Sequence, residues 1–79
     1  MSRARAVVEA VAKALADRPE SVNVTEREAR GQTFIELTMA PGDMGRVIGR
    51  QGRTAQAVRT LANLAAEMDG TRVSVDFRD

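Results

Sequence analysis

A loop bounded by two glycines is the part of this chain whose residue types and spacing suit it best to chemistry. Residues 47–53 read Val-Ile-Gly-Arg-Gln-Gly-Arg, between two segments with helical patterning. Glycine has no Cβ, so the backbone can turn sharply there and a ligand's own backbone can approach closely. The loop leads straight into a helix, and the free amides and dipole of a helix N-terminus favour phosphate oxygens. The sequence therefore predicts a phosphate-binding loop of Gly49, Arg50, Gln51 and Gly52.

The distribution of charge supports this prediction better than the total does. The formal net charge is +1, from 12 basic and 11 acidic side chains. Residues 44–66 nevertheless carry +4 and no acid, so the rest of the chain sums to −3. We expect Arg53, beside the loop, and Arg46, just before it, to contact the bound phosphates, whereas the direction of Arg59, about one and a half turns along the second helix, stays open. The alternative interpretation of these arginines is a solvated helix face with some ion pairing.

The composition argues against catalysis. The chain has no Cys and no His, which excludes disulfides, thiol nucleophiles, Cys/His zinc sites and imidazole acid–base chemistry. Glu26 and Glu28 share one face of a predicted strand, but they adjoin arginines and have no further catalytic group nearby, so we interpret them as solvated charges. We therefore expect no enzyme, no metal site, no cofactor and no small-molecule substrate. With two Phe and no Trp or Tyr, an aromatic platform for stacking bases is also missing.

Six elements must position the loop, and their limits follow from periodicity and breaker residues. Pro19 ends the first helix, Gly31 supplies the turn of a hairpin, Asp43 is a candidate N-cap, and Gly70 is placed to end the longest helix. In chain order we expect a helix over residues 5–16, an edge strand over 22–28, a better buried strand over 34–40, a short helix over 44–48, a helix over 54–68 and a strand over 73–77.

This order predicts one α+β domain over residues 1–79. Three strands with one apolar face each and three helices with one apolar stripe each fit a three-stranded sheet with the helices packed on one face. No apolar segment approaches the roughly 20 residues needed to span a bilayer, so we expect no membrane partner. A cytoplasmic location is the default expectation in the absence of a signal peptide.

The loop in its context resembles a known module. The run PGDMGRVIGRQGRT at residues 41–54, after two strands and before a third, resembles that of the KH domain, in which a GXXG loop clamps about four backbone nucleotides of single-stranded nucleic acid. The order α-β-β-α-α-β matches the type II (bacterial) arrangement. The resemblance extends over nearly all 79 residues to the small bacterial single-KH RNA-binding proteins of the KhpA (YlqC-like) family.

The resemblance implies a role for each loop residue and a set of partners. Gly49, Arg50, Gln51 and Gly52 would be the clamp, and Val47 and Ile48 would line the apolar floor of a groove, although we expect one of these two to be core. It also implies a non-catalytic, cytoplasmic binder of single-stranded RNA, acting as a post-transcriptional regulator or RNA chaperone with links to small RNAs, cell shape and cell wall biogenesis. Such a protein would form a homodimer, a heterodimer with a larger KH/R3H RNA-binding protein, or both. The alternative function is a protein-interaction or dimerisation adaptor with a KH-like fold and only secondary RNA contact.

Overall fold

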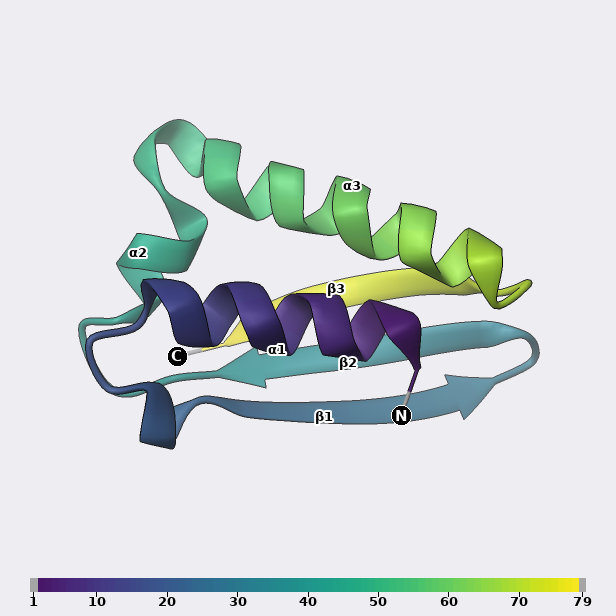
Figure 1. Cartoon of the computed structure of the whole chain (residues 1–79), viewed down its shortest axis with the longest axis horizontal. Helices are drawn as coiled ribbons and strands as arrows, with labels where there is room; N and C mark the ends of the chain where they lie inside the picture. The colour runs from purple at the N-terminus through teal and green to yellow at the C-terminus, as the bar shows by residue number, and fades with distance from the viewer. Residues whose placement is uncertain (1, 79) are drawn as a thin grey trace.

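The computed structural model describes residues 2–78 and contains the six expected elements in the expected order (Figure 1). The predicted α+β class is confirmed. None of the helices in these residues combines the length and apolarity needed to cross a bilayer. The elements are α1 (Arg3–Leu15), β1 (Asn23–Ala29), β2 (Gln32–Thr38), α2 (Met44–Ile48), α3 (Arg53–Met68) and β3 (Arg72–Arg78).

The three strands form a single mixed sheet with β2 in the centre. β1 pairs antiparallel with β2, and β3 pairs parallel with the other side of β2. The expectation that β1 is an edge strand and β2 is better buried is therefore confirmed. The helices lie on one face of this sheet, with α1 and α3 side by side across it and α2 at one end (Figure 1).

The core is small and built mainly from valine and alanine. Val8, Ile35, Leu37 and Val47 are at most 1% exposed and mark the layer between helices and sheet. Small side chains let α1 and α3 approach each other closely, which matters in a domain of this size because little apolar area is available to stabilise it. The buried alanines of the two helices are Ala4, Ala12, Ala55, Ala62, Ala65 and Ala66.

The start of α1 and the capping of α2 differ from the prediction. α1 begins two residues early because the Ser2 hydroxyl caps it, accepting a hydrogen bond from the Arg5 amide at 3.1 Å. The prediction that the Asp43 side chain caps α2 is wrong, because its carboxylate makes no hydrogen bond to the first amides of that helix. Asp43 precedes α2, but its backbone is helical (φ −84°, ψ −25°) and its buried carboxylate accepts from the Arg18 amide at 3.0 Å instead. The aspartate thus ties the segment before α2 to the segment after α1.

A two-residue turn joins β1 to β2 at the end of the molecule away from α2 (Figure 1). Both turn residues have positive φ, 54° for Arg30 and 77° for Gly31. This pattern suits the right-handed twist of a hairpin, but Asn or Gly is the usual residue at the first position. The sequence predicted the role of Gly31 and not the backbone conformation of Arg30.

A carboxylate links α1 to the edge strand and makes stability depend on pH. The Ser2 hydroxyl and amide donate to one Glu26 oxygen at 2.5 and 3.3 Å, and these hydrogen bonds lower the pKa of Glu26. A lowered pKa stabilises the fold above the unfolded-state pKa of about 4.3, and this contribution is lost as pH falls through the folded value.

We expect Glu26→Gln to lower the unfolding free energy by about 0.5–1 kcal/mol at pH 7, with the difference shrinking below about pH 4. Urea unfolding at both pH values measures it. Glu20→Gln, at an exposed glutamate, is the control, and an equal effect of the two substitutions would contradict the assignment.

Candidate nucleic-acid interface

Three residues of the loop between α2 and α3 have positive φ. Gly49 ends α2 at φ 72°, ψ 177°, Gln51 adopts φ 57°, and Gly52 adopts φ 71°, ψ 13° immediately before α3. The Gly52 amide donates to the Gly49 carbonyl at 3.2 Å and closes a tight turn over Arg50–Gly52, which the positive φ of Gln51 makes non-helical. The loop stands at one corner of the molecule, where α2 and α3 meet (Figure 1).

Gly49 has two separate reasons to be glycine. Its φ and ψ lie in a region that only glycine populates. In addition, a Cβ at this position would lie 2.8 Å from the Thr54 Cβ and closer still to the Thr54 hydroxyl. A Cβ on Gly52, by contrast, would meet nothing within 4 Å, so Gly52 is constrained by its φ alone. The two glycines therefore do different work in the same loop.

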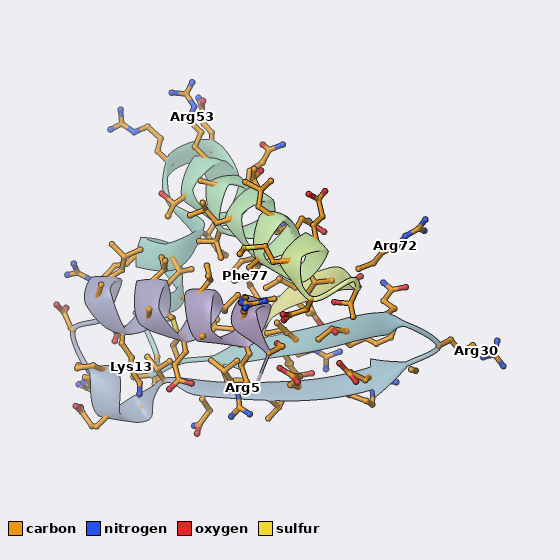
Figure 2. The ribbon with its side chains drawn as sticks, turned by 45° about the vertical axis from the view of Figure 1, so that its right-hand side comes forward. Arg5, Lys13, Arg30, Arg53, Arg72 and Phe77 are labelled. Atoms are coloured by element: carbon orange, nitrogen blue, oxygen red, sulfur yellow. The ribbon has the colours of Figure 1, made fainter. Side chains whose placement is uncertain are left out.

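The start of α3 carries uncompensated positive charge. Gly52 is the N-cap residue and has no side chain with which to cap the first amides, and the first turn holds no acid. Arg50 and Arg53 are exposed and take part in no ion pair within residues 2–78. Figure 2 shows Arg53 projecting from the end of α3 away from the rest of the molecule. This corner can accept a phosphate group without first breaking an internal contact.

Arg46 differs from these two arginines because it is already paired. Its guanidinium lies 2.9 Å from the Asp17 carboxylate and 4.0 Å from that of Asp43. Both partners lie outside the acid-free segment, although the three-residue spacing from Asp43 could have predicted one of them. The Arg46 and Asp17 side chains are 54% and 67% exposed, so their pair is weak and a phosphate could displace the aspartate. Contact between Arg46 and a ligand stays a prediction.

Val47 and Ile48, the two apolar residues before the loop, differ in burial. Val47 is 1% exposed and belongs to the core, as we expected of one of the pair, whereas Ile48 is 38% exposed. Of the two, Ile48 is therefore the one that exposes apolar surface next to the loop.

Arg59, whose direction the sequence left open, lies against β3. Its Nε donates to the Val75 carbonyl at 3.3 Å, and its guanidinium carbon lies 4.8 Å from the centre of the Phe77 ring. This contact could not be predicted from α3 alone, because it depends on where β3 joins the sheet.

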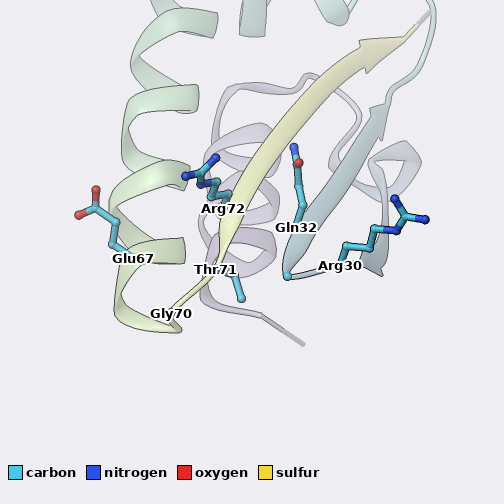
Figure 3. A pocket seen from close by; sticks show the side chains of 7 residues that line it. Arg30, Gln32, Glu67, Gly70, Thr71 and Arg72 are labelled. Carbon is cyan, nitrogen blue, oxygen red and sulfur yellow. The ribbon is translucent and has the colours of Figure 1, made fainter.

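A cavity of about 550 Å³ lies away from the loop, at the opposite end of the molecule, between the hairpin turn and the α3–β3 connection (Figure 3). Arg30 and Arg72 border it but point in different directions, and Glu67 adds a carboxylate, so it does not concentrate positive charge. Residues 2–78 contain no cluster of three acidic groups that could hold a metal ion.

Fold and loop together define the class of protein. A mixed three-stranded sheet with helices on one face and a GXXG loop between two of the helices is a KH domain, the module that grips nucleic-acid backbone through this loop. The family described as KhpA/KhpB, KH domain, matches residues 5–77, and the chain belongs to it. Membership of this non-enzymatic family also bears out the expectation that the chain is not an enzyme.

Curated relatives match over almost their whole length, and each carries the name RNA-binding protein KhpA. The protein from Caldanaerobacter subterraneus subsp. tengcongensis is 50% identical over 71 residues, which is 90% of this chain and 95% of that protein. The one from Halalkalibacterium halodurans is 44% identical over 95% of this chain and 99% of its own length. The one from Aquifex aeolicus is 41% identical over 98% of both chains.

Proposed function

We propose that this chain is a non-catalytic RNA-binding protein, a single KH domain over residues 1–79 that clamps single-stranded RNA with its GXXG loop. The observation that carries the proposal is the corner formed by Gly49, Gly52 and the start of α3, where Arg50 and Arg53, which form no ion pair with any described residue, flank a backbone open to phosphate. The relatives named for RNA binding support the choice of ligand. Gln51 is uncharged and does not repel phosphate, and Ile48 supplies the exposed apolar contact for a base.

Binding should be weak and only moderately dependent on salt. With two to four phosphates contacted, the slope of log K against log salt for single-stranded RNA should be about −1.5 to −3, and the dissociation constant about micromolar or weaker. Fluorescence anisotropy of a labelled, unstructured oligonucleotide over a salt series measures both values. A duplex of the same length is the control, because clamping of splayed single strands predicts weaker binding to it. A slope near zero, or stronger binding to the duplex, would contradict a single-strand clamp.

A second candidate function, association with another KH domain, is favoured by an apolar stripe on α3. Leu61, Leu64 and Met68 are 49%, 54% and 71% exposed, and their spacing of three and four residues, continued back to the exposed Ala57, places them on one side of the helix. The stripe contains no charge and could pack on the same stripe of a second copy around a two-fold axis. Four side chains offer far less than the roughly 800 Å² per partner of a stable interface, so the expected dimer is weak.

Light scattering over a concentration range tests this association. We expect a shift from monomer towards dimer at about 100 μM, abolished by Leu61→Glu with Leu64→Glu, because each dimer would bury four carboxylates. Thr60→Glu with Asn63→Glu, on a neighbouring exposed side of α3, is the matched control and should leave the dimer in place. A dimer that survives the leucine changes would rule out the stripe. A monomer throughout would leave a larger KH/R3H protein as the occupant to test.

The cellular setting belongs to the same proposal. We expect the protein in the cytoplasm, acting on RNA after transcription as a regulator or chaperone together with such a partner. Links to cell shape and cell wall biogenesis follow from the family resemblance alone.

A further inference from the structure

Arg59 is the one arginine of the +4 segment that the fold orients towards β3. The Arg59 Nε–H donates to the Val75 carbonyl, and one face of the Arg59 guanidinium lies over the Phe77 ring. An arginine has five N–H donors, so the four on its two terminal nitrogens remain available as a fork. Arg59 is an exposed residue, and within residues 2–78 its two terminal nitrogens take part in no hydrogen bond or ion pair. Arg59 is therefore both fixed in position and able to bind.

The surroundings of Arg59 offer further hydrogen-bonding groups. β3 is an edge strand, and its pairing with β2 uses only the backbone amides and carbonyls on the side that faces β2. The Val75 carbonyl faces Arg59 on the other side, and in an extended strand the polar groups of alternate residues point the same way. The backbone groups of Val75 and Phe77 next to the guanidinium thus lie on the unpaired edge. Together they make a polar strip between α3 and the sheet that a planar, polar ligand could use.

Arg59 is also at a suitable distance from the loop. It lies seven residues after Gly52, which is about 10 Å along the helix axis. A GXXG loop holds about four nucleotides, so a base attached to the gripped backbone falls within reach of this position. We propose that Arg59, held by Val75 and Phe77, reads one base of the bound RNA and makes the domain prefer guanine or cytosine at that nucleotide. This inference rests on the proposed function and adds base selection to it.

The preference follows from the geometry of the free fork. Two parallel N–H groups need two acceptors side by side, which guanine presents at O6 and N7. Cytosine presents the same pattern at O2 and N3. Adenine places its amino donor next to N7 and N1, and uracil has the N3–H between its two carbonyls, so neither base offers adjacent acceptors. A fixed guanidinium therefore favours guanine and cytosine and is indifferent or repulsive to the other two.

Single-nucleotide replacements in a uridine oligonucleotide of about eight residues, twice the number held by the loop, provide the test. Anisotropy titrations compare oligonucleotides carrying guanine, cytosine or adenine at each position in turn. We expect guanine or cytosine at one position to strengthen binding by about fivefold over adenine, the lower end of discrimination by a bidentate arginine. Arg59→Lys keeps the charge without the planar fork, so it should reduce the ratio and leave the salt slope unchanged. Arg59→Gln should invert the ratio, because an amide pairs with adenine. Thermal unfolding by circular dichroism confirms that both variants fold.

The outcomes separate this inference from the proposed function. Equal affinity of the parent for all four bases at every position overturns the reading role of Arg59 and leaves the clamp in place. A preference that persists in Arg59→Lys and Arg59→Gln also overturns it, because another residue then selects the base. Failure of the parent to bind any of the oligonucleotides overturns the clamp and base selection together. If guanine and cytosine differ, the stronger one identifies the edge that the fork contacts.

Discussion

Replacing Arg50 and Gln51 by aspartate, with Gly49 and Gly52 kept, should abolish RNA binding while the protein stays folded. Arg50 and Gln51 are both exposed, so neither supports the core. The double substitution turns one positive charge into two negative ones next to the phosphates, and like charges at a binding surface are strongly unfavourable. We expect an affinity loss of at least about a hundredfold, equivalent to about 2.7 kcal/mol. Anisotropy measures the loss, and the unfolding midpoint should change by no more than a few degrees.

The hairpin at the other end of the molecule provides a matched control. Arg30→Asp with Gln32→Asp makes the same change in charge, and Arg30 has φ 54°, close to the 57° of Gln51. Because long-range electrostatic effects are screened within about 10 Å at ordinary salt, this variant should bind RNA within about threefold of the parent. An equal loss in both variants would mean that RNA responds to net charge and not to the loop. Unchanged binding by the loop variant would place the RNA elsewhere on the protein.

Of the glycine-to-alanine substitutions in this chain, Gly49→Ala should be the most destabilising. The added Cβ would collide with Thr54 at 2.8 Å and would also force alanine into a backbone region reserved for glycine. We expect a loss of about 2–4 kcal/mol in unfolding free energy, which is a large share of the roughly 5 kcal/mol available to a small domain. Thermal unfolding should show a fall of about 10–25 °C.

Gly52→Ala is the control that isolates the collision. Gly52 has φ 71° but open space where its Cβ would be, so only the left-handed backbone is penalised, by about 1–2 kcal/mol. The difference between the two variants measures the contribution of Thr54. Similar destabilisation by both would show that the loop relaxes around the methyl group and is less rigid than the structure indicates.

The order of the elements could be predicted from the sequence because each boundary carries a strong local signal. Pro19 stops α1, Gly70 and Thr71 close α3 by donating to the Glu67 and Ala66 carbonyls, and alternation marks the strands. One error lies where a side chain finds a distant partner. Asp43 looks like a cap locally, but the Arg18 amide, 25 residues away in the sequence, takes its carboxylate. Local patterns carry no information about such a competitor.

In the site, too, the features with a local sequence signal could be predicted and those that depend on distant contacts could not. The GXXG spacing, the helix that follows it and the exposed Arg50 and Arg53 are local features and could be predicted. The pairing of Arg46 with Asp17, the contact of Arg59 with β3 and the collision that reserves Gly49 for glycine depend on how segments meet in three dimensions. Because β3 pairs with β2 and packs against α3, only the assembled sheet determines that Arg59 contacts β3.

The backbone of the loop also has a consequence for the kinetics of association. Its conformation is imposed from within, by Gly49 against Thr54 and by two further left-handed residues, and does not wait for a ligand to order it. A receptor formed in advance loses little conformational entropy on binding and needs no slow rearrangement after encounter. RNA should therefore bind in a single kinetic phase at a rate set by diffusion and charge, so that ligands of different affinity are distinguished by how long they stay bound.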